Sequence, residues 1–292
     1  MNSDFRLEAH LDFRSRAGDL TSGSSGRIRV VCGTAGTWVL RLVVLDGELK
    51  AGEVLRIART DLMLAYRFQD SNPRGRDYVT LACSSDADLR LDLAPRSNRL
   101  IEICLTKGCL ERGAELVLRL GDRRAGSVGS VICGAVSQGR LSFYALQEQQ
   151  VYAVAQDYRV EVTFSDQPAA LRLIGPPVVA PRETVGLHLV VFDLNRNVIE
   201  TFCEPVVFDL PDGVGGMDGE ARFEPAEGGI KIMEGVSFAQ PGVYRIGVSL
   251  PDRGLQTCSN PIICREGAGA RIYWGDLHCH GWGDCTMYQM HD

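Results

Sequence analysis

Short runs in which apolar residues alternate with polar ones recur along most of the chain. Alternate side chains of a β-strand project to opposite faces, so this period of two predicts strands that bury one face. Glycine, aspartate and proline separate the runs, and no segment carries the apolar stripe of an amphipathic helix. The first set of runs covers residues 27–32, 37–45, 54–58, 78–83, 99–104, 114–120, 140–144 and 158–164. This pattern predicts a mainly β protein that begins with a β-sandwich.

A polar stretch around Pro168 ends the first set, and a second set of strand-like runs follows it. These runs cover residues 170–174, 185–192, 205–209, 229–233 and 242–249. They resemble the immunoglobulin-like modules that precede catalytic domains in many bacterial enzymes. We therefore expect a flexible lead-in over residues 1–25, a β-sandwich over 26–166 and an Ig-like β-sandwich over 167–265. Residues 266–292 are expected to form a linker and the start of a third domain.

Charge and composition exclude several classes of protein. The 292 residues carry a net charge of −6, and no arginine-rich run offers a footprint for a nucleic-acid backbone. The longest apolar stretches fall far short of the roughly 20 residues that cross a bilayer. The residues after Met1 are mixed polar and acidic, unlike a signal peptide. With Met1 as the true start, we expect a cytoplasmic protein that contacts neither nucleic acid nor membrane.

The chain has ten cysteines, but they do not form a disulfide or metal framework in the sequence. There is no Cys-x-x-Cys, and most cysteines lie in apolar runs, as Cys32 and Cys203 do. Such thiols behave as small core residues, so we expect them to be buried and free. Two pairs are close enough to bridge if the intervening turns allow it, and the sequence leaves this open. The pairs are Cys104 with Cys109, and Cys258 with Cys264.

Two loop motifs are candidates for ion-binding sites, one for calcium and one for an anion. Asp193-Leu-Asn195-Arg-Asn197 begins like a calcium-binding loop, but Val198 stands where such a loop needs glycine. Flanking strand patterns favour a hairpin turn instead. The glycine-rich segment 121–129 contains two arginines, Arg123 and Arg124, that could hold an anion. It lacks the Gly-Lys-Ser/Thr ending of a phosphate loop, and no helix pattern follows it, so we expect a loop between strands.

The candidate chemistry lies at the end of the chain. Three of the five histidines fall there, and His278 and His280 stand one residue apart after an apolar run. On a strand their side chains would point the same way and could share a metal ion, while Cys279 would point opposite. Asp284 follows as a candidate carboxylate ligand. Catalytic zinc usually takes three protein ligands and multinuclear sites take more, so further ligands would have to lie beyond Asp292.

Residues 273–280, Tyr-Trp-Gly-Asp-Leu-His-Cys-His, resemble the opening strand of the polymerase and histidinol phosphatase (PHP) superfamily. Their form is similar to that of an uncharacterised PHP-like family whose members carry β-rich domains ahead of the metal domain. The resemblance implies a distorted β/α barrel that begins here, binds two or three divalent ions (Zn, Mn or Fe) and hydrolyses phosphoesters. It implies that His278 and His280 are ligands. The Ser-Asp-Gly usual in that family is replaced by Gly283-Asp284-Cys285.

The sequence thus predicts the N-terminal part of a metal-dependent hydrolase that uses metal-activated water on a small-molecule substrate such as a phosphoester. We expect this chain by itself to be inactive. Asp276 would accept a hydrogen bond from the second N–H of a ligand histidine and so orient its ring. The alternative is a non-enzymatic β-sandwich module that binds or positions a partner, with an incidental histidine tail. A third hypothesis is that two copies of the chain complete one metal site. Metal retention through His278 and His280 separates the hydrolase from the module.

Overall fold

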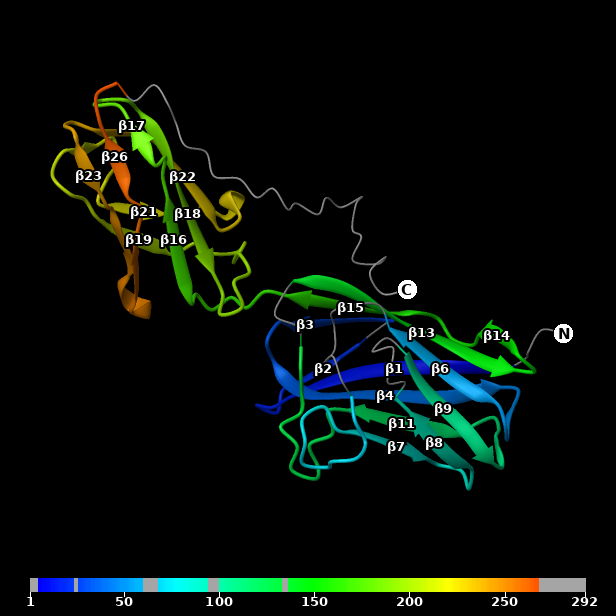
Figure 1. Cartoon of the computed structure of the whole chain (residues 1–292). Coiled ribbons are helices and arrows are strands. Elements are labelled where there is room, and N and C mark those ends of the chain that lie inside the picture. The colour runs from blue at the N-terminus through cyan, green and yellow to red at the C-terminus, as the bar shows by residue number, and fades with distance from the viewer. Residues whose placement is uncertain (1–4, 24–25, 60–67, 94–99, 133–135, 268–292) are drawn as a thin grey trace. The chain divides into compact units, whose positions relative to one another are not determined.

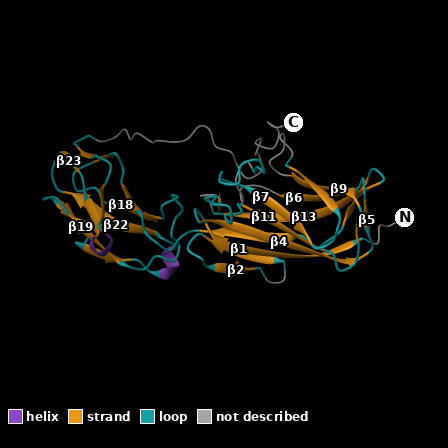
Figure 2. Ribbon diagram, turned by 90° about the horizontal axis from the view of Figure 1, so that it is seen from below, coloured by secondary structure: helices purple, strands orange, loops and turns teal. Residues whose placement is uncertain are grey.

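The computed structural model describes residues 5–23, 26–59, 68–93, 100–132 and 136–267. In this part the chain is built from strands and turns, and the helical elements are two single 3-10 turns, η1 (Pro225–Glu227) and η2 (Pro251–Arg253) (Figures 1 and 2). The described residues divide into two compact units. The first contains the residues up to Ala170 together with Phe192–Thr201, and the second contains Leu171–Val191 and the residues from Phe202.

The first unit contains two larger sheets. One has the strand order β2 (Leu20–Ser22), β1 (Arg6–Ser15), β4 (Ala35–Asp46), β11 (Glu115–Leu120) and β7 (Val79–Cys83), with β12 (Ser130–Val131) also paired to β4. The other has the order β3 (Arg27–Val31), β15 (Tyr158–Thr163), β13 (Ser137–Gln147), β6 (Val54–Arg59), β9 (Leu100–Lys107) and β8 (Asp88–Asp92), with β14 (Gln150–Ala153) paired to β13. A short ribbon joins β5 (Leu49–Lys50) to β10 (Cys109–Leu110).

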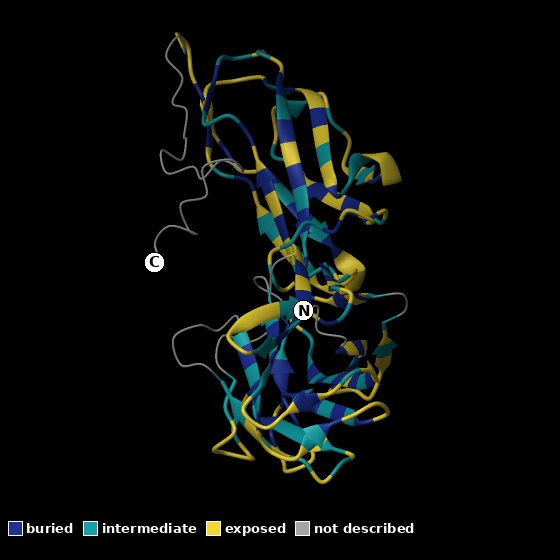
Figure 3. Ribbon diagram, turned by 90° about the vertical axis from the view of Figure 1, so that its right-hand side faces the viewer, coloured by how far each residue is buried: buried dark blue, intermediate teal, exposed yellow. Residues whose placement is uncertain are grey.

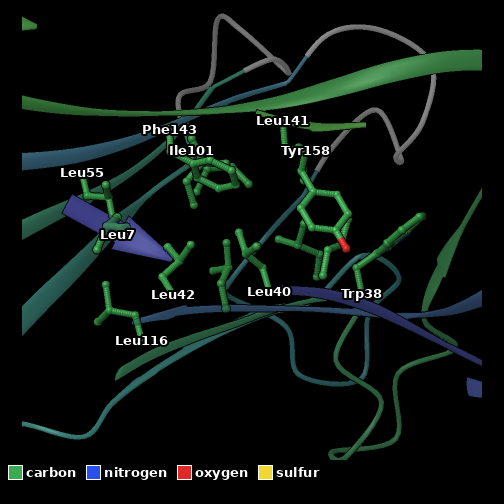
Figure 4. Close-up of a cluster of buried hydrophobic side chains, with 14 of the residues drawn as sticks. Leu7, Trp38, Leu40, Leu42, Leu55, Ile101, Leu116, Leu141, Phe143 and Tyr158 are labelled. Carbon is green, nitrogen blue, oxygen red and sulfur yellow. The ribbon is translucent and has the colours of Figure 1, made fainter. Parts of the chain in front are cut away.

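The hydrophobic core of this unit lies between the two sheets. In β4 every second residue is buried, from Trp38 through Leu40 and Leu42 to Val44, while Arg41 between them is exposed. Figure 4 shows Trp38, Leu40 and Leu42 facing Phe143 and Tyr158 from the other sheet. The same alternation of buried and exposed positions is visible along other strands (Figure 3). Burying a Leu or Val side chain stabilises a fold by about 1.5–3 kcal/mol, so this interleaved face holds the sandwich together.

The prediction that residues 1–25 form a flexible lead-in is wrong for most of the residues that the structure describes there. Residues Arg6–Ser15 form β1, which pairs with β4 along almost its whole length. The physical reason is the alternation of apolar residues, which places Leu11 opposite Leu40 and Phe13 opposite Trp38. The rings of Phe13 and Trp38 lie 4.8 Å apart between centroids. β1 is therefore a central part of the first unit.

The second unit is also built from small sheets. One contains β16 (Ala170–Ile174), β18 (Val185–Phe192), β22 (Ile230–Phe238) and β20 (Val214–Gly215), in that order. Another contains β21 (Glu220–Arg222), β19 (Pro205–Asp209), β24 (Gly247–Leu250) and β25 (Leu255–Cys258). The third joins β17 (Val178–Val179), β26 (Ile262–Cys264) and β23 (Gly242–Tyr244). From β18 to β22, successive strands belong in turn to the first and to the second of these sheets.

The mainly β fold is confirmed, and each predicted run coincides with a strand or a pair of strands. The division between units falls at Ala170 rather than at residue 166, and the hairpin Phe192–Thr201 belongs to the first unit rather than the second. The start of the PHP-like domain, residues 268–292, lies outside the described residues. Among the described residues no helix has the length and apolar character needed to span a bilayer.

The packing of β1 predicts a large effect of truncating Leu11, which is 1% exposed. Leu11→Ala would leave a cavity between the sheets, and we expect it to lower the free energy of unfolding by about 2–5 kcal/mol. Urea denaturation measures this loss. The control is Leu20→Ala in β2, where the side chain is 54% exposed and the expected change is within about 0.5 kcal/mol. Equal, negligible effects of the two substitutions would contradict the placement of β1 in the core.

Candidate functional site

The candidate metal residues of the sequence lie outside the described residues. His278, His280, Asp284 and Asp276 all fall within residues 268–292. Within the part of the chain that the structure describes, no group of three or more histidine, cysteine, aspartate or glutamate side chains is arranged to hold a metal ion. The two described histidines stand singly on strands, with His10 in β1 and His188 in β18, and both are exposed. The metal site thus remains a prediction that rests on the tail motif.

The calcium-like motif is a closed turn. Asp193 is 1% exposed, and its Oδ1 accepts hydrogen bonds from the backbone N–H groups of Asn195 and Asn197 at 2.8 and 2.9 Å. Its Oδ2 accepts the backbone N–H of Ser165 at 3.1 Å. Burial by itself raises the pKa of Asp193, but hydrogen bonds from Asn197 and Ser165 outweigh it and hold the pKa below its ordinary value. The carboxylate is occupied by these donors, which confirms the hairpin interpretation.

Asp193 also accepts a hydrogen bond from a buried thiol. Cys32 Sγ donates to Asp193 Oδ2 at 3.1 Å, and the side-chain amides of Asn195 and Asn197 lie 3.5 and 3.2 Å from the same sulfur. Burial first, and then the hydrogen bond and negative charge of Asp193, raise the pKa of Cys32 to about 11. The thiolate is the nucleophilic form of cysteine. Cys32 is therefore a protonated hydrogen-bond donor that ties the turn to the end of β3.

In the glycine-rich loop after β11, both arginines donate hydrogen bonds to other residues of the first unit. Arg123 donates to the backbone carbonyl of Ser15 at 3.1 Å, and Arg124 donates to the carboxylate of Asp122 at 2.6 Å and to Thr80 Oγ1 at 3.2 Å. Burial raises the pKa of Asp122, but the hydrogen bonds from Arg124 and Thr80 prevail and lower it to about 2. The loop is a structural connection between strands, as expected, rather than an anion cradle.

The described cysteines are free, including both pairs that the sequence left open. Cys32 and Cys264 are buried, and Cys83, Cys104 and Cys109 are partly buried. Cys203 and Cys258 are exposed, so the expectation of burial is wrong for Cys203. Cys203 lies in the turn region between β18 and β19, where Phe202 takes the buried position and the next residue points outward.

A groove in the first unit is lined by residues of β7 and β8, which are edge strands of its two larger sheets. Its volume is about 490 Å³, and the residues that line it come mainly from these two strands and the turn between them. They are Asp70, Tyr78, Val79, Thr80, Leu81, Cys83, Ser85, Ala87, Asp88, Leu89 and Leu91. Hydroxyl, thiol and carboxylate groups alternate there with leucines. Its described lining offers hydroxyl and carboxylate groups that can form hydrogen bonds.

No known protein family matches the chain, and no curated protein is similar to it. Among solved structures, a cohesin module from a family 33 glycoside hydrolase of Clostridium perfringens is 8% identical, with a TM-score of 0.31, over 56% of this chain and 100% of that module. A putative membrane-anchored protein from Corynebacterium diphtheriae is 12% identical, with a TM-score of 0.24, over 90% and 59%. Dimeric latent PorU from Porphyromonas gingivalis is 14% identical, with a TM-score of 0.24, over 88% and 20%. These likenesses are too weak to carry a functional argument.

The buried carboxylate of Asp122 predicts a pH-dependent contribution to stability. Its folded pKa of about 2 lies below the ordinary 3.8, so it stabilises the fold by about 2 kcal/mol above pH 4, and this contribution is lost as the pH falls toward 2. We expect Asp122→Asn to lower the free energy of unfolding by at least that amount at pH 7 and by progressively less in acid. Denaturant titrations across this range test it. Asp86→Asn, at an exposed position between β7 and β8, is the control, and a constant difference from pH 7 to pH 3 would contradict the assignment.

Thiol reactivity tests the environment of Cys32. Because its pKa is raised to about 11, only about a thousandth of this thiol is ionised at pH 8, and burial blocks access as well. We expect iodoacetamide to label Cys203 and Cys258 in the folded protein and to leave Cys32 unmodified, as measured by peptide mass spectrometry. Labelling in denaturant provides the control for intrinsic reactivity. Modification of Cys32 as fast as Cys203 in the folded protein would show that the thiol is not held by Asp193.

Proposed function

We propose that this chain supplies the β-rich N-terminal part and the first metal-binding strand of a metal-dependent hydrolase of phosphoesterase type. The observation that carries the proposal is the spacing of His278 and His280 within residues 273–280. Their alternate positions suit two imidazoles bound to one ion. The two β-rich units that precede the motif support the proposal, because they match the domain order of the PHP-like family that the motif resembles.

Each tail residue has a proposed role. His278 and His280 would bind the metal through neutral imidazole nitrogens, a donor type that suits Zn, Mn or Fe. Asp284 is the candidate carboxylate ligand, and Asp276 would accept the second N–H of a ligand histidine and so fix its orientation. Divalent ions, when bound, lower the pKa of a water molecule and neutralise charge on phosphoryl oxygens. Two imidazoles and one carboxylate are few ligands for such a site, so we expect residues 1–292 alone to bind metal without turnover.

Metal retention tests this proposal directly. The wild-type chain, after exposure to Zn²⁺ or Mn²⁺ and gel filtration, is expected to retain metal that is lost in the double variant His278→Ala/His280→Ala. Elemental analysis measures the metal per chain. The matched control is His10→Ala/His188→Ala, which removes two exposed strand histidines from the described units and should leave retention unchanged.

Equal retention by the wild type and the tail double variant would overturn the metal role of His278 and His280. The chain would then be better explained as a non-enzymatic β-sandwich module. Equal loss in both double variants would mean that histidines bind metal without specificity, which also contradicts the proposal. Circular dichroism of each variant establishes that the strands are intact, so that a loss of metal is not a loss of fold.

A further inference from the structure

The outer face of one sheet in the first unit collects arginines that are far apart in the sequence. Arg159 of β15 lies directly opposite Arg27 of β3 on one side and Arg140 of β13 on the other. These three strands are adjacent (Figure 1). Paired residues project to the same face of a sheet, and neighbouring strands lie about 4.8 Å apart. Arg27, Arg159 and Arg140 therefore form a row across three strands, and all three are exposed.

This arginine row is only partly neutralised. Glu161 Oε1 and Oε2 lie 3.2 Å from Arg27 and 3.1 Å from Arg29, so that one carboxylate serves two guanidinium groups. Asp157 pairs with Arg140 at 3.3 Å. The guanidinium of Arg159, at the centre of the row, makes no hydrogen bond or ion pair with the described residues. Because like charges placed opposite each other destabilise a sheet, the row is an unfavourable arrangement for the folded chain by itself.

We propose that the arginine row binds a compact tetrahedral oxyanion, a phosphate or sulfate group, centred on Arg159. Guanidinium groups present a planar fork of donors that fits such oxygens in pairs, and a doubly charged anion would offset the repulsion along the row. Glu161 is the next outward-facing residue of β15. Its charge would repel an extended polyanion that runs along the strand, which favours a compact group over a nucleic-acid backbone.

The test uses inorganic phosphate as the probe, with thermal unfolding of the full chain as the readout. Potassium chloride holds the ionic strength constant, because general screening also relieves repulsion between arginines. We expect phosphate to raise the melting temperature of the wild type saturably, and Arg159→Gln to need at least about fivefold more phosphate for the same rise. Without phosphate, Arg159→Gln should melt at the same or a higher temperature than the wild type, since a repulsive charge has been removed.

Arg90→Gln provides the matched control. Arg90 is an exposed arginine at the other end of the same sheet, in β8, and its substitution should leave the phosphate response unchanged. A purely structural role for Arg159 predicts the opposite sign, with a lower melting temperature in the absence of phosphate. The same phosphate response in the wild type and Arg159→Gln would overturn the proposal.

Two further probes separate the sources of the anion. Sulfate at equal ionic strength should act like phosphate if the row recognises tetrahedral oxyanions in general, whereas a response to phosphate alone supports a phosphate group. Single-stranded DNA provides the polyanion arm. Arg159-dependent binding to DNA that is far tighter than binding to phosphate would overturn the compact-anion proposal in favour of a polymer. None of these outcomes depends on His278 or His280, so this proposal and the proposed function can fail separately.

Discussion

The first unit depends on one interaction above the others, the burial of one face of β4 between two sheets. β4 pairs with β1 and β11, and its inward residues Trp38, Leu40, Leu42 and Val44 are all buried. Because a one-residue slip in a strand moves every inward side chain to the solvent, this face also fixes the register of the neighbouring strands. The positions of the exposed charges follow from that register. The arginine row is set by the same alternation that places Ile28, Leu141 and Val160 in the core.

The sequence predicted most strands because period-two alternation leaves a local signal. β1 carries that signal too, with Leu7, Leu11 and Phe13 buried, but its outward residues are charged and the glycine-serine segment after it is typical of a flexible tail. Strand pairing was the missing information, since β4 supplies the partner that buries this face. The arginine row could not be predicted for a related reason. Arg27, Arg140 and Arg159 belong to different runs, and only the strand order brings them together.

In two polar motifs, residues that could hold a ligand stabilise the fold instead. Asp193 begins a calcium-like loop, and Asp122 lies in a glycine-rich loop that could have held an anion. Each carboxylate is buried and satisfied by local donors, which hold its pKa below the ordinary value. A buried carboxylate without such donors would cost several kcal/mol, so the donors and the acid must be present together. The local sequence shows that an aspartate is present, but it does not show that the carboxylate is buried and hydrogen-bonded within the fold.

The same rule of alternation underlies the metal hypothesis. In β18 it places Leu187 and Leu189 in the core and His188 between them on the exposed face. A single histidine of this kind has no second imidazole at the neighbouring outward positions, Gly186 and Val190. His278 and His280 differ because they occupy two successive positions on one face, with Cys279 on the other, if the tail forms a strand. Neutral imidazole is the commonest metal ligand in proteins, and two of them on one face could bind the same ion. The spacing of the pair, rather than the presence of histidine, is thus the physical basis for the hydrolase proposal.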